Sequence, residues 1–178
     1  MKQIGISTLF LILPVLISGC ITFHTMSYEI NLYDKQRGLA KVEISDIRSD
    51  ASEEEEFLLD KQNLIDYAYR SDQFVIDMKA EGKDISIREL EENNGILNAR
   101  IEYFFDNINE VEGIVHSDNY FVLTLEISDS IVSTNGVVVK SENVKRIIWE
   151  DTTKTLTFKM FSEDQQGKNY RDLTKFLK

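Results

Sequence analysis

Most of the chain after residue 26 alternates apolar and polar positions with a period of two. This period is typical of β-strands that bury one face. Residues 28–32 form the first such segment, the polar run 34–38 predicts a turn, and residues 39–47 form a second segment. The pattern therefore predicts an opening β-hairpin.

After residue 50 the spacing becomes helical. Ser52 and Glu55 have the spacing of a capping box, and the acids at 53–56 suit the positive end of a helix dipole. The apolar residues that then recur at intervals of a helix turn are Phe57, Leu64, Ala68, Val75 and Met78, widened by Ile65 and Ile76. We expect one helix from about Ser52 to Ala80, with Ser71-Asp72 as its weak point and Gly82 just beyond its end.

Strand signals return after Lys83. Asn94-Gly95 and Asn135-Gly136 are dipeptides that favour two-residue turns, and apolar segments flank both of them. Between these two turns, a polar loop at 106–113 precedes a regularly alternating strand at 121–127.

The end of the chain predicts one more hairpin and a short helix. The hairpin joins residues 144–149 to residues 155–161 across Asp151-Thr152, and the helix lies within residues 170–177. These elements indicate an α+β fold: a mainly antiparallel β-sheet built from sequential hairpins, with one long helix packed on a face and a short C-terminal helix.

The first 20 residues follow a different pattern. Lys2 precedes an apolar run that ends at Ile17, and Ser18-Gly19 lead directly to Cys20. The run is too short for a stable membrane span and is typical of a secretory leader. Residues 16–20 resemble the lipobox of bacterial lipoproteins. An ordinary secretory signal with a chance cysteine, or an uncleaved anchor, is the alternative.

The lipobox resemblance implies three parts. A lipoprotein signal peptide (1–19) is removed, Cys20 is acylated and begins a short tether (20–25), and residues 26–178 form a single α+β domain. Cys20 is the only cysteine, so no disulfide partner exists for it. Ile21, not aspartate, follows Cys20, and in Gram-negative lipoproteins this favours the outer membrane. The expected location is therefore membrane-anchored outside the cytoplasm, on the periplasmic side or at the cell surface.

Two stretches of the mature chain resemble lipoprotein domains of the mycobacterial LppM type. They are the predicted hairpin at 28–47 and the segment at 133–149. Proteins of that type carry a C-terminal membrane segment, which residues 170–178 do not provide. The function of such domains is unclear, so the resemblance implies a fold element and no activity.

Charge excludes one class of partner. The formal net charge is −11 and the pI is about 4.7. Nucleic-acid binding needs clustered Lys and Arg, so we expect no nucleic-acid partner. An acidic body is also repelled by anionic lipids, and several acyl chains would hold it at a bilayer that its own surface avoids.

Candidate chemistry is sparse, and we expect no cofactor and no metal site. The chain has two histidines, His24 and His116, and no cysteine besides Cys20, so Cys/His zinc spacing is impossible. No nucleophile elbow or phosphate-binding loop occurs. The acidic run at 106–113 is similar in composition to a calcium-binding loop. EF-hand spacing, however, would place the apolar residue Ile108 at the first ligand position, which needs an oxygen ligand.

Aromatic residues offer the other route to a site. The candidates for ligand binding are Tyr67, Tyr69, Phe74, Tyr103 and Phe104, with Trp149 as a further member. They would line a groove between the helix and the sheet, although plain core packing explains their spacing as well. Phe104 points opposite Tyr103 and Phe105, so we expect it on an outer sheet face, where an apolar patch would indicate a partner.

Three functional hypotheses follow. The leading one is a non-enzymatic, membrane-tethered module that binds a protein or another component of the cell envelope. A small-ligand or lipid carrier that uses the helix–sheet groove is the second. A carboxylate-dependent hydrolase is the third and requires two acids roughly 5–10 Å apart in a cleft.

The lipobox interpretation makes a direct prediction. Cells fed a labelled fatty acid should incorporate the label into the protein, because the thiol of Cys20 and the new amino terminus would both be acylated. Gel autoradiography of the immunoprecipitated protein measures this. An unlabelled protein, or a cytosolic form with its leader intact, would contradict it.

Overall fold

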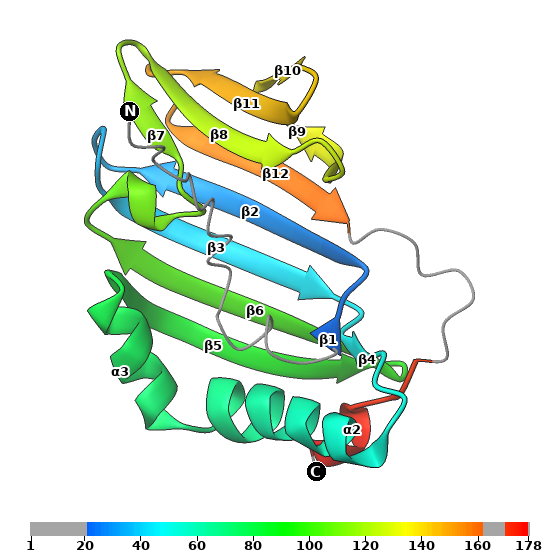
Figure 1. Ribbon diagram of the computed structural model, residues 1–178. Coiled ribbons are helices and arrows are strands. Elements are labelled where there is room, and N and C mark those ends of the chain that lie inside the picture. Colours follow the sequence, from blue (N-terminus) through cyan, green and yellow to red (C-terminus); the bar gives the residue numbers. More distant parts are fainter. Residues whose placement is uncertain (1–20, 162–169, 178) are drawn as a thin grey trace, which may run out of the picture.

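The computed structural model describes residues 21–161 and 170–177. The predicted leader (1–19) and Cys20 lie outside these residues. The described part is mostly antiparallel β-sheet, in sheets of six, four and two strands (Figure 1). The predicted antiparallel pairing is confirmed, since every strand pair runs antiparallel.

The largest sheet holds six strands. In spatial order they are β5 (Lys83–Asn93), β6 (Ile96–Phe105), β3 (Gly38–Ser45), β2 (Thr25–Leu32), β12 (Thr155–Phe161) and β9 (Ser130–Thr134). The predicted opening hairpin is confirmed as β2 and β3. Asn94-Gly95 joins β5 to β6 with φ of 56° and 78°, which fits a two-residue turn that needs positive φ at both positions.

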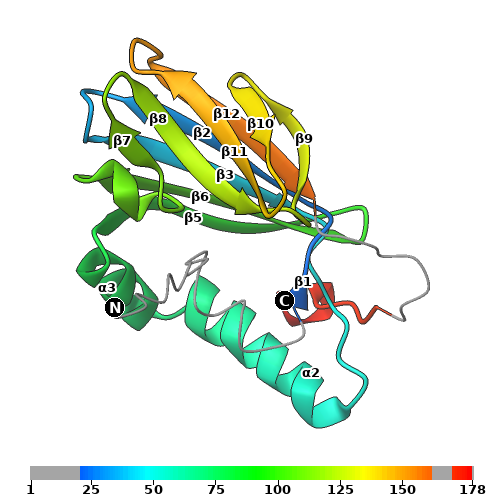
Figure 2. The same cartoon turned by 45° about the horizontal axis from the view of Figure 1, so that its top comes forward.

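The second sheet lies against the first and forms a sandwich with it (Figure 2). Its strands are β10 (Val137–Lys140), β11 (Val144–Glu150), β8 (Tyr120–Glu126) and β7 (Val115–Ser117). A short 3-10 turn, η2 (Ile108–Glu110), connects β6 to β7. Trp149 of β11 and Phe158 of β12 face each other across the sandwich, with ring centroids 6.2 Å apart.

Strand pairing begins at residue 21, within the stretch predicted as a tether. β1 (Ile21–Thr22) pairs with β4 (Arg48–Ser49), and β2 starts at Thr25. The backbone of Ser49 also pairs with that of Arg171 near the C-terminus. The buried Ser49 hydroxyl donates a hydrogen bond of 2.6 Å to Asp60 on the first helix, so three parts of the chain meet at this residue.

The predicted fold class is wrong in its main helical feature, because no long helix packs on a sheet face in the described residues. The first helix consists of α2 (Glu54–Lys61), which continues into the π-helical turn η1 (Gln62–Tyr69). The chain then breaks, and α3 (Asp72–Ala80) starts afresh with Ser71 capping its first turn. The break falls at the predicted weak point.

The wider π-helical turn and the break change which side chains face inward. The predicted apolar stripe included Val75 and Ile76, whereas the structure buries Phe74 and leaves Ile76 59% exposed. Glu53, not Ser52, is the N-cap residue, and no side chain caps the helix there, so the capping box is also absent. At the C-terminus, only a 3-10 turn, η3 (Thr174–Phe176), forms in place of a helix.

Two predicted turns connect different sheets and do not close hairpins. β11 pairs with β8 and β10, while β12 pairs with β2 and β9, so the predicted last hairpin is wrong. β9 and β10, on either side of Asn135-Gly136, likewise belong to different sheets. The two halves of each predicted hairpin therefore belong to different sheets and do not pair edge to edge.

One face of the six-stranded sheet carries most of the core. Register places Tyr28, Val42, Ile101 and Phe158 on the same face of neighbouring strands, and all four are buried. The four-stranded sheet covers this inner face over β2 and β12, and buried side chains of the helices cover it near β5 and β6. The opposite face of the six-stranded sheet is open to water.

The junction between the two sheets generates a stability prediction. A Cβ atom on Gly136 would lie 2.7 Å from Nε1 of Trp149 and 2.8 Å from Cγ2 of Ile147. Gly136→Ala should therefore lower the free energy of unfolding by about 2 kcal/mol and alter the fluorescence of Trp149, the only tryptophan. Urea titration followed by fluorescence measures both effects.

Gly95→Ala is the matched control. Gly95 has φ of 78°, and a Cβ atom added there would meet no atom within 4 Å, so its substitution strains only the local turn. It should leave the folded-state fluorescence unchanged. Equal fluorescence changes in both variants would contradict the proposed contact of residue 136 with Trp149.

Candidate functional site

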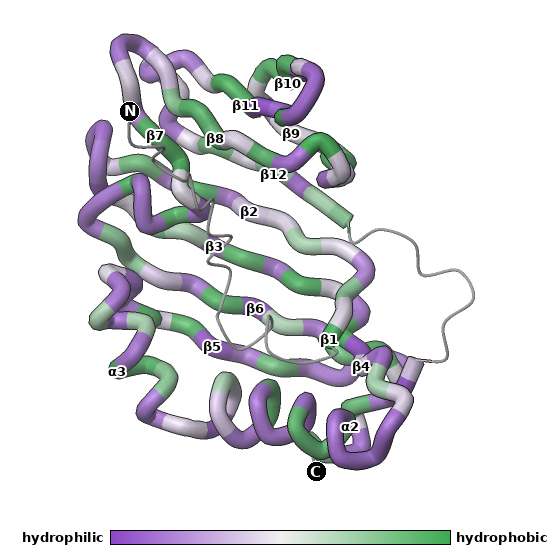
Figure 3. Tube along the Cα trace, in the orientation of Figure 1, coloured by the Kyte–Doolittle hydropathy of each residue, from purple (hydrophilic) through white to green (hydrophobic). Residues whose placement is uncertain are grey.

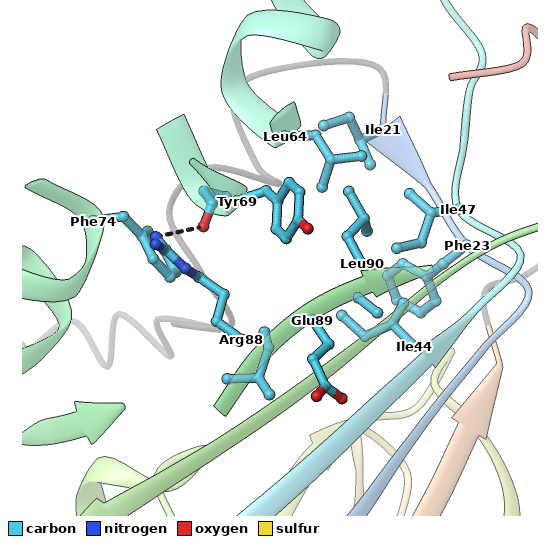
Figure 4. A pocket seen from close by; sticks show the side chains of 13 residues that line it. Ile21, Phe23, Ile44, Ile47, Leu64, Tyr69, Phe74, Arg88, Glu89 and Leu90 are labelled. Atoms are coloured by element: carbon cyan, nitrogen blue, oxygen red, sulfur yellow. Dashed lines mark hydrogen bonds between the residues drawn. The ribbon is translucent and has the colours of Figure 1, made fainter. Parts of the chain in front are cut away.

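An apolar pocket lies between the helices and the β5 edge of the six-stranded sheet (Figure 4). Leu64 and Tyr69 of η1 and Phe74 of α3 line one side, and Leu90 of β5 lines another. Ile21 of β1, which directly follows Cys20 in the sequence, also lines this pocket. Arg88 closes one end, because its guanidinium donates hydrogen bonds to the carbonyl oxygens of Ala68 and Ser71.

The pocket is narrow. Its cavity volume is about 30 Å³, roughly the space of one water molecule. Pockets for small ligands are usually at least about 300 Å³. A lipid chain would enter only if Leu64, Tyr69 or their neighbours moved, so the geometry gives the carrier hypothesis little support.

The structure separates the five aromatic residues that sequence reasoning grouped. Tyr69 and Phe74 line the pocket. Tyr67 packs edge-on against Phe74 and donates a hydrogen bond to Asp77. Tyr103 is buried in the sheet core, and Phe104 is 44% exposed on the opposite face, as predicted for it. The five residues therefore form no common groove.

A second, polar groove lies on the open face of the six-stranded sheet, with a cavity volume of about 380 Å³. It contains Glu43, Glu89 and Glu91, so it is the place to look for a pair of catalytic acids. Arg100 lies between the first two on β6 and approaches Glu89 to 3.6 Å. Glu43 and Glu89 are each about half exposed. A glycosidase acid needs a water-poor surrounding, which this face does not supply.

The acidic loop at 106–113 directs its last acid into the protein. Tyr28 donates a hydrogen bond of 2.8 Å from its hydroxyl to Oε1 of Glu112. Glu112 adopts φ of 54°, in the left-handed region. Burial raises the pKa of Glu112 to about 7, although the bond from Tyr28 and the charge of Lys83 act in the opposite direction. The carboxyl therefore belongs to the packing of the loop against β2.

His116 lies beside an aromatic ring and an acid. His116 stacks against Phe121, and its Nε2 lies 3.8 Å from a carboxylate oxygen of Asp151, which also pairs with Lys35. No hydrogen bond joins the His116 ring to a serine within residues 21–161 and 170–177. In the same ranges, no three His, Cys, Asp or Glu side chains are grouped to hold a metal ion. Nor is any helix there long and apolar enough to cross a membrane.

The most distinctive surface is the outer face of the four-stranded sheet. Register places one row of apolar side chains across all four strands: Val137, Ile148, Val122 and Val115. Val137 is 67% exposed and Val115 48% exposed, while the two central residues are half-buried. We call these four residues, with Val139 and Tyr120 on the same face, the outer apolar face.

Sequence reasoning missed this face, although a signal was present. Residues 137–139 and 147–149 are consecutive apolar runs, as are residues 121–123. Runs without alternation are typical of strands that are apolar on both faces. Along β10 the hydropathy colouring shows such a run (Figure 3). The sequence analysis treated these segments as hairpin strands with one buried face. It therefore did not predict that their second face is apolar as well.

Comparison of this chain with protein-family models, curated proteins and solved structures finds no match. Its geometry is therefore the basis for any functional conclusion.

The buried carboxyl of Glu112 generates a pH prediction. Its pKa of about 7 in the folded chain exceeds the usual 4.5, so the folded state holds more protons than the unfolded state between these values. Stability contributed by the protonated acid is present below pH 4.5 and is lost as pH rises to 7. The loss should reach about 3 kcal/mol in the free energy of unfolding.

Glu112→Gln should abolish this part of the pH dependence, because an amide still accepts the bond from Tyr28 and does not ionise. Urea unfolding at pH 5 and pH 8 measures the difference between wild type and variant. Glu91→Gln on the exposed end of β5 is the matched control and should retain the wild-type slope. Identical slopes in all three proteins would show that Glu112 is not buried in solution.

Proposed function

We propose that the protein is a membrane-anchored bacterial lipoprotein whose folded domain is a non-enzymatic binding module. Its partner is another protein of the cell envelope. The observation that carries the proposal is the outer apolar face, which no described part of the chain covers. Exposed apolar patches on monomers commonly mark sites of protein–protein contact.

The position of this face supports a protein partner over a lipid one. β1, which begins next to Cys20, lies beside the helices at one end of the molecule, and the four-stranded sheet lies at the other end in both views (Figures 1 and 2). With Cys20 acylated, the helix end would face the bilayer and the outer apolar face would lie at the end of the molecule distant from it. A surface in that position meets proteins and not acyl chains.

The remaining geometry supports a module without catalysis. In the polar groove, Glu89 pairs with Arg100 and Glu43 pairs with Lys41, and the narrow pocket leaves room for little more than a water molecule. Neither arrangement brings a nucleophile and a base together. The acidic net charge of −11 supports solubility of the body next to the membrane but supplies no site of its own.

Site-specific photocrosslinking in native membranes tests the proposal. A benzoyl-phenylalanine at position 137 should form an adduct of one defined mass, because Val137 is the most exposed residue of the outer apolar face. The same group at position 76 is the control, since Ile76 is 59% exposed on α3 at the other end of the molecule. Mass spectrometry identifies the adduct.

A substitution within the face provides the second part of the test. Val122→Asp should reduce the adduct at position 137 by about tenfold, because it places a charge between the apolar side chains of Ile148 and Val115. Adducts of the same kind and yield at positions 137 and 76, or none at 137, would refute the proposed surface.

A further inference from the structure

The open edge of β10 has unused backbone groups. Ser141 N–H donates a hydrogen bond of 2.9 Å to the carbonyl of Val144, which identifies this pair as hydrogen-bonded. In antiparallel pairs, hydrogen-bonded and non-hydrogen-bonded positions alternate. Val139 and Val137 therefore direct their backbone groups to β11, and Val138 and Lys140 direct theirs outward. No hydrogen bond among the described residues engages these outward groups.

The other edge strands of the six-stranded and four-stranded sheets, β5, β9 and β7, have features that oppose pairing. β5 carries the exposed acids Glu89, Glu91 and Glu92, has a register shift between Ile85 and Ile87, and lies beside α3. β7 has only three residues, and the pairing of β9 with β12 is interrupted by a register shift. Charges, bulges and shortness are the usual means by which sheet edges avoid association.

β10 lacks most of these devices. It has three consecutive valines in regular register with β11, and Lys140 at its end is its only charged residue. Valine strongly favours extended backbone, so the edge is preformed for another strand. Because the edges at β5, β7 and β9 oppose pairing and the edge at β10 does not, β10 is the edge at which another strand would bind.

The charges beside β10 indicate the kind of strand. Lys140 and Arg146 form no ion pair with the described residues, although the molecule as a whole is acidic. Val139 is the cross-strand neighbour of Arg146, so one cation lies on the outer apolar face and the other at the open edge. The two cations lie on opposite faces of the sheet, so acidic side chains on either face of an added strand would meet one of them.

We propose that β10 accepts an extended, acidic segment of a partner protein as a fifth strand of the four-stranded sheet. This inference rests on the proposed function and specifies how the partner is held. Backbone hydrogen bonds at Val138 and Lys140 supply the affinity, and the two cations supply the preference for acids. A second copy of the chain is a poor occupant, because each copy carries a net charge of −11.

Amide hydrogen exchange of the full chain in detergent micelles tests strand addition at the backbone. In the free protein, the amides of Val138 and Lys140 should exchange rapidly, and those of Val137 and Val139 should be protected. The probe is a seven-residue peptide that alternates valine with glutamate, at up to about 1 mM, the range of weak complexes. It should protect the amides of Val138 and Lys140 at least about tenfold.

A peptide of the same length that alternates valine with lysine is the control and should protect neither amide. Equal protection by both peptides would overturn the acidic preference. Absence of protection by the acidic peptide would overturn strand addition. Protection that grows with protein concentration in the absence of peptide would replace the partner with a second copy.

Two variants test separately the backbone of Val138 and the charge of Lys140 in peptide binding. Val138→Pro removes an outward N–H and no bond to β11, so protection of Lys140 by the acidic peptide should fall about tenfold. Lys140→Glu keeps every backbone group, so it remains informative even if the proline variant does not fold. It should reverse the preference to the basic peptide.

The two proposals fail in different ways. Peptide protection without a crosslinked partner at position 137 would retain the strand-accepting edge and refute the proposed function. A crosslinked partner together with unprotected amides at Val138 and Lys140 would retain the function and refute strand addition.

Discussion

The inner face of the six-stranded sheet must be kept from water, and the rest of the structure follows from how this is done. Its apolar side chains extend from β12 to β5, a width that neither the helices nor the second sheet covers alone. The four-stranded sheet covers one side and the two helices cover the other. Burial of this area is the main favourable contribution to folding.

This division of the inner face explains where the candidate surfaces lie. The narrow pocket sits where helix side chains meet β5, at the end of the molecule that holds β1. The four-stranded sheet has its inner face in the sandwich, and nothing in the described chain covers its second face. An apolar second face is costly in water, and its retention together with an unprotected edge at β10 favours use in binding.

The pairing of neighbouring strands in hairpins could be predicted from the sequence. The distribution of strands between the two sheets could not. The β2–β3 and β5–β6 hairpins were predictable because alternation and the Asn94-Gly95 turn are local signals. Asn135-Gly136 has the same signature, yet the side-chain oxygen of Asn135 accepts bonds from Trp149 and Thr157 and holds a junction between sheets. Whether two strands pair or stack depends on contacts distant in sequence.

The helix and the candidate site show the same limit. The weak point at Ser71 was visible, but the π-helical turn before it shifts the buried positions from Val75 and Ile76 to Phe74. The aromatic candidates were chosen by residue type, and only Tyr69 and Phe74 share a pocket. The outer apolar face was present as unbroken apolar runs. Its interpretation required the register across β7, β8, β11 and β10.

The meeting point at Ser49 has a mechanical consequence. β1 begins at Ile21 and pairs with β4, where Ser49 is joined to the backbone of Arg171 and to the side chain of Asp60. A pull on the amino terminus would load the C-terminal segment and the first helix at once, in place of peeling one strand. A load applied at β1 would thus be spread over the helix end, and the open edge of β10, at the far end, would remain unstrained.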